Sequence, residues 1–429
     1  MMETTMKLLF ISLGCDKNLV DTEFMLGMIR DAGTFDGQPI EMTDDEYQAD
    51  IIIINTCCFI NDAKEESVNT ILEMAEYKKT GSCKVLVVTG CMAQRYKNEI
   101  IEEVPEVDAV LGTTSYGDIL KAIREAMEGK HFQEFKDIDY LPEKLGKRVL
   151  TTGGHFGYLK IAEGCDKHCT YCIIPKLRGK FRSVPMERLV TQAKEMAEEG
   201  VKELILVAQE TTVYGTDIYG KKSLHILLKE LCKIKGIRWI RVLYCYPEEI
   251  YDELIQTMKE EKKICHYLDL PIQHASDRIL KRMGRRTTQA ELVEIVNKLR
   301  REIPDIVLRT TLISGFPGET QEDHEELMSF VDEMEFDRLG VFTYSPEEDT
   351  PAATMPDQVA EEVKEARRDE IMELQQEISY DKGTDRIGQE LLVMIEGKVA
   401  DESAYIGRTY GDAPKVDGYI FVQTGELLM

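Results

Sequence analysis

Short apolar runs that alternate with amphipathic stretches limit the fold of this chain more than any other feature. In the first 125 residues the apolar runs predict strands over Met6–Gly14, Ala49–Thr56, Lys84–Gly90 and Ala109–Gly112. Helical periodicity lies between them, over Leu19–Arg30, Asp62–Lys78, Asn98–Glu103 and Tyr116–Glu128. Strands that are apolar on both faces need helices on both sides, so this region is predicted to form a parallel sheet between two helical layers.

The alternation returns after residues 130–154, which hold few periodic apolar residues and which we interpret as a linker. Six further strands are predicted over Tyr158–Glu163, Glu203–Ala208, Trp239–Cys245, Tyr267–Leu270, Ile306–Ile313 and Leu339–Phe342. The helices between them are predicted near Met186–Glu199, Leu224–Ile234, Pro247–Glu260, Thr288–Arg301 and Gln321–Met334. Such strand–helix units predict an open (β/α)6 barrel, a partial version of the eight-unit barrel.

The end of the chain has a different character. A charged helix is predicted over Gln358–Tyr380, and the segment that follows is rich in Val, Ile, Tyr, Thr and Gly with turns at 411–412 and 417–418. This composition predicts a small antiparallel β-barrel. The expected class is therefore α/β multidomain, with domains over residues 1–129, 155–380 and 381–429 and the linker over 130–154.

Three cysteines, Cys165, Cys169 and Cys172, follow one another with the spacing C-x3-C-x2-C. Three thiolates this close can hold three irons of a four-iron, four-sulfur cluster. No fourth cysteine follows nearby, so one iron is left open, and an open metal position is where a metal site does chemistry. The alternative is a structural zinc site, which needs a fourth nitrogen or sulfur ligand that His168, inside the motif, is poorly placed to supply.

A second set of cysteines is spread along the chain, but each member stands at the end of a predicted strand. These are Cys15, Cys57 and Cys91. Ligands of open α/β sheets bind at the carboxyl ends of the strands, and glycines at 14 and 90 allow close approach of a bulky group. We expect the three thiols to converge on a second cluster with one open iron; the alternative is three unrelated buried cysteines.

The other cysteines have no partner at ligand spacing. Cys58 adjoins Cys57, and adjacent residues of a strand point to opposite faces, so Cys58 is expected in the core. We expect the remaining four to be structural as well: Cys83, Cys232, Cys245 and Cys265.

The overall composition, 43% apolar and 31% charged residues, is that of a globular protein, and no apolar run approaches the ~20 residues of a membrane span. The first residues lack the pattern of a signal peptide. A cytoplasmic location is therefore expected, where thiols stay reduced and clustered cysteines indicate metal or catalysis. The net charge of −26 repels phosphate backbones and favours basic partners.

The C-x3-C-x2-C motif resembles that of the radical S-adenosylmethionine (SAM) enzymes, and two sets of three cysteines resemble the methylthiotransferases within them. Almost the whole chain takes part in the resemblance. The matching stretches are S-L-G-C-D-K-N-L-V-D (12–21), I-N-T-C (54–57), V-T-G-C-M-A-Q-R (88–95), E-G-C-D-K-H-C-T-Y-C-I-I-P (163–175), V-A-Q-E-T-T (207–212), D-L-P-I-Q-H (269–274), G-F-P-G-E-T (315–320) and G-R-T-Y-G-D-A-P (407–414). Departures are Cys58, where glycine is usual, Glu210, where aspartate is usual, and an early end of the terminal segment, called TRAM in the family, whose barrel is therefore expected to be incomplete.

The resemblance implies two 4Fe-4S clusters and SAM as cofactors. The cluster on Cys165, Cys169 and Cys172 is implied to be the catalytic one, which reduces SAM to give a 5′-deoxyadenosyl radical. The cluster on the other three cysteines is implied to carry the sulfur that is inserted, and both are expected to face one cavity. SAM contacts are expected from six residues: Tyr171, Arg178, Arg182, Gln209, Glu210 and Gly315.

Within this family the chain is most similar to the members that methylthiolate the β-carbon of an aspartate in protein twelve of the small ribosomal subunit. The terminal segment from Gly383 carries four Lys and Arg against eight Asp and Glu, a net −4, which suits a basic protein better than RNA, so direct nucleic-acid binding is not expected. The expected partners are that protein or its subunit, an electron donor and a sulfur donor, with no membrane. Two alternatives stay open, a tRNA adenosine methylthiotransferase and a non-catalytic two-cluster redox protein, although carriers commonly saturate every iron.

Overall fold

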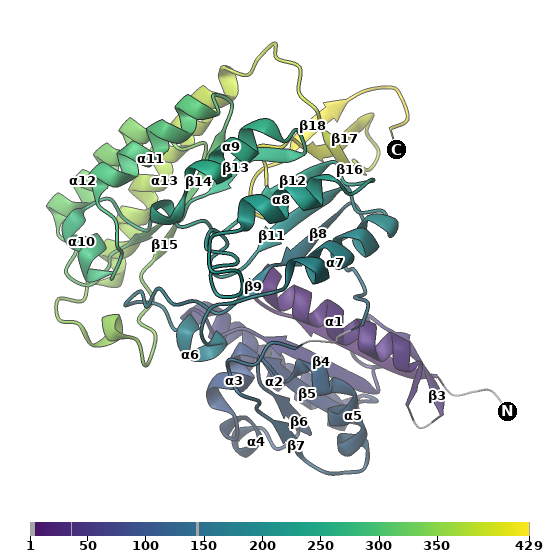
Figure 1. The fold of residues 1–429 in the computed structure, drawn as a ribbon. Helices are drawn as coiled ribbons and strands as arrows, with labels where there is room; N and C mark the ends of the chain where they lie inside the picture. The colour runs from purple at the N-terminus through teal and green to yellow at the C-terminus, as the bar shows by residue number, and fades with distance from the viewer. Residues whose placement is uncertain (1–4, 36, 143–145, 429) are drawn as a thin grey trace. The chain divides into compact units, whose positions relative to one another are not determined.

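The computed structural model describes residues 5–35, 37–142 and 146–428. They form two compact units, each made of several chain segments. The first unit holds Met1–Gly153, Ala162–Val184 and Ser345–Ala353, and the second holds Gly154–Ile161, Pro185–Tyr344 and Thr354–Met429. Each unit is built around its own sheet (Figure 1). The segment 162–184, which carries the C-x3-C-x2-C motif, belongs to the first unit, although its neighbours in sequence belong to the second.

The first unit contains a seven-stranded sheet whose order is β2-β3-β1-β4-β5-β6-β7. The strands are β1 (Met6–Ser12), β2 (Thr34–Phe35), β3 (Gln38–Met42), β4 (Ile51–Thr56), β5 (Val85–Gly90), β6 (Ala109–Leu111) and β7 (Phe132–Glu134). All neighbours are parallel except β2 and β3. The predicted parallel sheet is therefore confirmed, and every residue of β4 and β5 is buried, as expected for strands covered on both faces.

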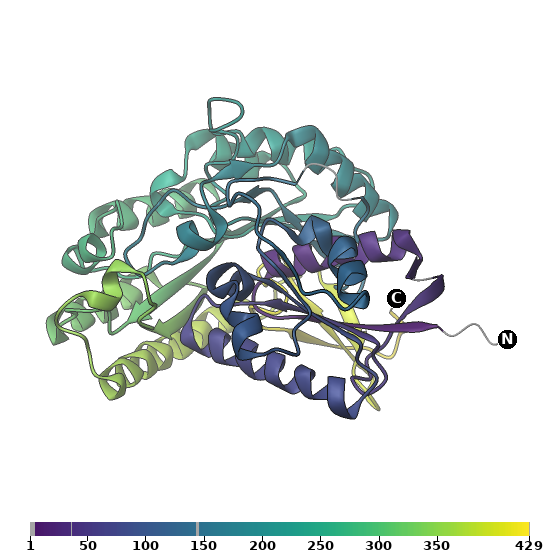
Figure 2. The same ribbon diagram turned by 90° about the horizontal axis from the view of Figure 1, so that it is seen from below.

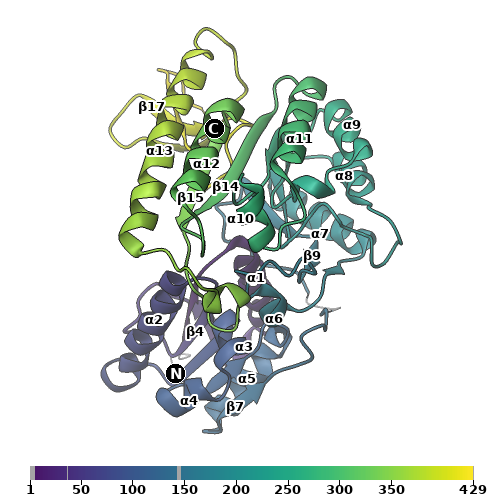
Figure 3. The same ribbon diagram turned by 90° about the vertical axis from the view of Figure 1, so that its left-hand side faces the viewer.

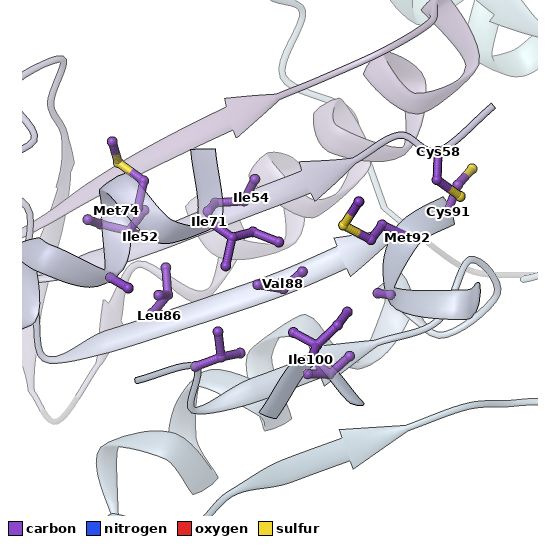
Figure 4. Packing of buried hydrophobic residues seen from close by; sticks show 14 of the residues in the cluster. Ile52, Ile54, Cys58, Ile71, Met74, Leu86, Val88, Cys91, Met92 and Ile100 are labelled. Carbon is purple, nitrogen blue, oxygen red and sulfur yellow. The ribbon is translucent and has the colours of Figure 1, made fainter. Parts of the chain in front are cut away.

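Helices lie on both faces of this sheet. They are α1 (Asp16–Ala32), α2 (Asn61–Thr80), α3 (Cys91–Tyr96), α4 (Glu99–Glu103), the 3₁₀ turn η1 (Tyr116–Asp118) and α5 (Ile119–Met127). In Figure 2 the purple α1 and the blue-violet α2 lie on opposite sides of the strands. The inner faces of the strands and α2 form one core, in which Ile52, Ile54, Leu86 and Val88 meet Ile71 (Figure 4).

The second unit contains the predicted six-stranded parallel sheet. Its order is β15-β14-β13-β12-β11-β8, so β8 and β15 lie at opposite edges. The strands are β8 (Phe156–Lys160), β11 (Glu203–Val207), β12 (Trp239–Val242), β13 (Ile264–Asp269), β14 (Val307–Ser314) and β15 (Arg338–Thr343). All five pairs are parallel. This is the partial barrel that the alternation of strands and helices predicts.

Helices cover the second sheet, and all of them except α10 are predicted from the sequence. They are α7 (Met186–Glu198), α8 (Leu224–Cys232), η2 (Pro247–Glu249), α9 (Asp252–Glu260), α10 (Asp277–Arg282), α11 (Gln289–Glu302), α12 (Gln321–Met334) and α13 (Glu361–Thr384). The 3₁₀ turn η3 (Pro351–Thr354) belongs mostly to the first unit. Figure 3 shows α12 and α13 side by side next to β14 and β15. Both α11 and α12 begin with a capping box, which fixes their first turns.

The C-terminal segment forms a three-stranded antiparallel sheet of β16 (Met394–Lys398), β17 (Ala404–Arg408) and β18 (Ile420–Gln423). Buried ion pairs attach it to the larger sheet of the same unit. The guanidinium of Arg408, which is fully buried, lies 2.8 Å from Glu203 and 2.5 Å from Glu396. Arg241 binds the other oxygen of Glu203 at 2.7 Å. A buried charge is costly without an oppositely charged partner, so these ion pairs fix the C-terminal sheet against the six-stranded sheet.

Several short elements of the first unit are not predicted by the hydrophobic pattern, among them β7, β3 and α3. The strand β7 lies inside the predicted linker, where only three residues pair with β6. The strand β3 contains Pro39 and has no fully buried residue, because it lies near the edge of its sheet. The third, α3, starts at Cys91 directly after β5 and is only six residues long.

Candidate functional site

Cys15, Cys57 and Cys91, here called the auxiliary trio, stand at the carboxyl ends of three neighbouring strands. Cys15 precedes α1 after β1, Cys57 follows β4, and Cys91 opens α3 after β5. Burial raises the pKa of the Cys57 thiol to about 12, and the nearby Cys91 and Cys15 sulfurs add to the rise. Thiols that perturb each other in this way lie close together, as the strand order predicts.

Two glycines make room for the auxiliary trio. At Gly14 the backbone has φ +82°, and an added Cβ would lie 2.6 Å from Cβ and 2.8 Å from Sγ of Cys57. At Gly90 φ is +95°, and a Cβ would meet Asn55 Oδ1 at 2.3 Å. Only glycine adopts a positive φ readily and has no Cβ to collide with these atoms, so both turns next to the cysteines require glycine.

The backbone of Cys57 is fixed by one serine. The hydroxyl of Ser67 accepts a hydrogen bond from the Cys57 N–H at 3.1 Å and donates one to its carbonyl at 2.8 Å. Cys58 is fully buried among apolar residues, where the sequence predicts it, although Figure 4 shows its sulfur near Cys91. Burial and Cys91 raise the pKa of the Cys58 thiol, and the Arg95 guanidinium opposes them. Cys58 therefore lies beside the auxiliary trio, on its core side.

Cys165, Cys169 and Cys172, here called the loop trio, lie in a loop that is closed by a short antiparallel pair, β9 (Ala162–Glu163) with β10 (Arg182–Ser183). The N–H of Cys165 donates to Gly179 O at 3.1 Å, and that of Cys172 donates to Cys169 O at 3.0 Å. Burial raises the pKa of the Cys172 thiol, and the Cys169 and Cys165 sulfurs raise it further. The three thiols therefore lie near one another, and their convergence on one cluster stays a prediction.

Gly164 lets the loop fold back on itself. Its φ is +78°, and a Cβ there would lie 2.0 Å from Lys180 O. In the described part of the chain, no three His, Cys, Asp or Glu side chains lie at the distances that one metal ion requires. In a 4Fe-4S cluster each thiolate binds a different iron, and three neighbouring thiols beside a glycine turn suit such a cluster. Both trios fit the group that the sequence predicts for them.

Arg178 ends the short helix α6 (Ile174–Arg178) and is 2% exposed. Its Nη1 donates to Asp21 Oδ2 at 2.9 Å and lies 3.4 Å from Glu163 Oε2. Its Nη2 donates to Asn18 Oδ1, and the same Asn18 oxygen lies 3.9 Å from Cys91 Sγ. The buried contacts tie Arg178 to the auxiliary trio, whereas the predicted pairing with a SAM carboxylate stays a prediction.

Two other SAM residues predicted in the first unit lie near the loop trio. Tyr171 is half-buried in the turn between Cys169 and Cys172. Arg182 lies in β10, where Nη1 is 3.4 Å from Asp139 Oδ1 and Nη2 donates to Arg178 O at 3.0 Å. Burial lowers the pKa of Arg182. Contact of these residues with SAM stays a prediction.

The predicted SAM residues of the second unit lie at the carboxyl edge of its sheet. Gln209 and Glu210 follow β11, and Glu210 accepts hydrogen bonds from Thr212 N at 2.8 Å and Thr212 Oγ1 at 2.5 Å. Gly315 follows β14 with φ +71°, and a Cβ there would meet Lys364 Cγ at 2.2 Å. The close approach at Gly315 thus involves Lys364, and its approach to a cofactor stays a prediction.

Asn18, Asp21 and Glu163 lie in stretches that carry the family resemblance, but the sequence predicts no role for them. Asn18 Nδ2 donates to Leu13 O at 3.1 Å and to Thr56 O at 3.0 Å, so one side chain joins the turns after β1 and β4. Asn18 and Asp21 are three residues apart in α1 and are both buried. Polar residues at helical spacing on a buried face are the signal that could have identified them.

Comparison with known proteins identifies the chain. The radical SAM superfamily matches residues 159–331, the family described as uncharacterized protein family UPF0004 matches 7–112, and the TRAM domain matches 387–428. The protein described as ribosomal protein uS12 methylthiotransferase RimO from Lachnoclostridium phytofermentans is 66% identical over 424 residues, which are 99% of this chain and 95% of that one. The chain belongs to the RimO family. RimO proteins from Clostridium perfringens and Clostridioides difficile are 54% and 49% identical, over 96% and 98% of this chain and 91% and 93% of their own.

Solved structures share the fold at low identity. The radical SAM methyltransferase TsrM from Kitasatospora setae matches with a TM-score of 0.56 and 14% identity, over 79% of this chain and 73% of that one. The cobalamin-dependent radical SAM enzyme OxsB matches with a TM-score of 0.55 and 14% identity, over 88% and 56%. The multidomain α/β fold predicted from the sequence is confirmed by the family matches and the sheets together. Within the residues that the structure describes, no helix could cross a membrane.

Proposed function

We infer that this chain is a radical SAM methylthiotransferase that modifies the β-carbon of an aspartate in ribosomal protein uS12. The observation that supports this most strongly is the 66% identity to a RimO protein over 99% of the chain. The two trios supply the ligands that the activity needs, and both lie in the first unit. An electron carrier is not favoured, because neither trio has a fourth cysteine in its motif.

The cofactors are two 4Fe-4S clusters and SAM. When bound, the cluster on the loop trio supplies the electron that cleaves SAM, and the cluster on the auxiliary trio supplies the sulfur for insertion at a C–H bond. The protein holds the ligands in place. Ser67 fixes the backbone of Cys57, and Gly14 and Gly164 allow the tight turns. Cys165 and Cys169 are 7% and 5% exposed, so the loop buries two of its three ligands, whereas Cys172 is half-buried.

The surface of the C-terminal segment supports a protein substrate. Of its charged residues, Arg408, Asp412 and Asp417 are directed inward, where they pair with groups of the larger sheet. The exposed charges that remain are still more acidic than basic. A surface of this kind attracts basic ribosomal proteins and repels phosphate backbones. We therefore propose uS12, free or in its subunit, as the partner, and the cytoplasm, where ribosomes work, as the location.

The test uses cells that lack their own uS12-modifying enzyme. The chain or its Cys57→Ala variant is expressed, and uS12 and bulk tRNA are analysed by mass spectrometry. We expect a mass gain of one methylthio group on the uS12 aspartate with the parent chain and none with the variant. A methylthio group on tRNA adenosine with unmodified uS12 would contradict the proposed substrate.

A further inference from the structure

Arg178 joins the segment that carries the loop trio to residues beside the auxiliary trio. It lies six residues after Cys172 in sequence, but its guanidinium ends among residues of α1 and β9. The preceding residue, Leu177, accepts a hydrogen bond from Thr113 Oγ1 at 2.8 Å, which fixes α6 against the end of the first sheet. A single side chain thus reaches from the loop to the sheet edge.

The guanidinium is held in one orientation. Asp21 and Glu163 bind Nη1 at 2.9 and 3.4 Å, and Asn18 binds Nη2. Arg178, Asp21 and Glu163 are 2%, 3% and 6% exposed, so their charges act in a medium of low dielectric constant. Asn18, in turn, is anchored to the strand ends by its amide. These hydrogen bonds hold the guanidinium in a fixed orientation relative to α1 and the ends of β1 and β4.

The sulfur of Cys91 lies within reach of this network. The Cys91 sulfur lies 3.9 Å from Asn18 Oδ1, the same oxygen that accepts a hydrogen bond from Arg178 Nη2. Asn18 therefore links the guanidinium to one ligand of the auxiliary trio. The buried positive charge of Arg178 is held on the Cys91 side of that trio.

We propose that Arg178 is a positioning residue of the auxiliary cluster, which orients Cys91 and raises the reduction potential of that cluster. Reduction adds one negative charge, and a buried cation that is linked to a ligand sulfur through Asn18 stabilises that charge. Asp21 and Glu163 act in the opposite direction, because they neutralise part of the cation. The inference rests on the proposed function, since it requires a cluster on the auxiliary trio.

The experiment isolates that cluster in the full chain. Cys165, Cys169 and Cys172 are replaced by Ala, so that only the auxiliary trio binds iron. The protein is reconstituted anaerobically, and its reduction midpoint is followed by electron paramagnetic resonance. We expect Arg178→Gln to lower the midpoint, Arg178→Lys to lower it less, and Asp21→Asn to raise it. The control is Lys176→Gln, on the same helix. Its Nζ donates to a backbone oxygen, Asp349 O, at 2.8 Å, and its replacement should leave the midpoint unchanged.

The outcomes separate a tuning role from a purely structural one. If Arg178 only stabilises the fold, Arg178→Gln lowers the unfolding temperature of the cluster-free protein and the midpoint does not move, which overturns the proposal. Should Arg178→Gln not fold, the Asp21→Asn variant decides: a raised midpoint supports the proposal, and a midpoint that falls or stays constant overturns it. A parent protein that binds no iron on the auxiliary trio would overturn both this proposal and the proposed function. A parent with a normal cluster and unmoved midpoints would overturn this proposal alone.

Discussion

Replacement of Gly14 by Ala is the sharpest test of how the auxiliary trio is built. The backbone at Gly14 has φ +82°, which costs an L-residue roughly 1–2 kcal/mol. The new Cβ would lie 2.6 Å from Cys57 Cβ, and ordinary contact begins at 3.4 Å, so the cysteine must move by roughly 0.8 Å. Forcing a methyl into a packed site costs a further ~1–3 kcal/mol. We expect a total cost of about 2–5 kcal/mol.

The displacement also affects the metal site. Metal-ligand distances tolerate about 0.2 Å, so a cysteine shifted by several times that amount no longer binds its iron in place. Iron is measured after anaerobic reconstitution, and the free energy of unfolding of the cluster-free protein is measured in urea. We expect about eight irons per chain in the parent, two clusters of four, and about four in Gly14→Ala.

Gly33→Ala is the matched control. Gly33 follows the other end of α1 with φ +71°, and an added Cβ there meets no atom within 4 Å. This variant should lose only the roughly 1–2 kcal/mol of the backbone conformation and keep about eight irons. If the two variants lose the same stability and both keep the iron of the parent, the close approach of Gly14 to Cys57 has no role and the reasoning is refuted.

Three further results are expected. After anaerobic reconstitution, Cys57→Ser should contain about four irons fewer than the parent, because the cluster needs all three ligands of the trio. Cys58→Ser should contain as much iron as the parent, because Cys58 lies on the core side of the trio. Equal losses of iron would place Cys58 among the ligands. Arg408→Met leaves Glu203 buried without that cation and should cost about 3–5 kcal/mol of unfolding free energy in urea, and a loss below 1 kcal/mol would contradict a buried ion pair. Burial acts to raise the pKa of Asp323, but its hydrogen bonds outweigh it and lower the pKa from 3.8 to about 2. The folded state is thus stabilised above about pH 4, and this stability disappears between pH 4 and 2; acid unfolding should be less steep in Asp323→Asn, and an unchanged profile would count against the lowered pKa.

Much of the fold could be predicted from local hydrophobic patterns. The strands β4 and β5 are continuous runs of Ile, Val and Leu, which are typical of strands buried on both faces. The bounds predicted for these two strands differ from the observed ones by at most two residues. The strands β3 and β7 were not predicted: β7 is an edge strand, β3 has only the two-residue β2 on its outer side, and both carry polar residues.

The candidate site divides in the same way. The loop trio is encoded locally, because three ligands within eight residues are already close before the chain folds. The three cysteines of the auxiliary trio are far apart in the sequence. They could be predicted to lie together only because parallel strands place their carboxyl ends at one edge of the sheet. Arg178 could not be assigned from its position in the sequence, because its partners Asn18 and Asp21 are about 160 residues away.

The sequence alone determined which atoms are available as ligands and which strands carry them, because cysteine spacing and hydrophobic period are local properties of the chain. The tertiary structure alone decided which charges surround those ligands, since Arg178, Asp21 and Glu163 meet only when distant segments pack together. Electrostatic interactions and hydrogen bonds depend on separations of a few ångströms in space, and separation along the chain does not reveal these distances.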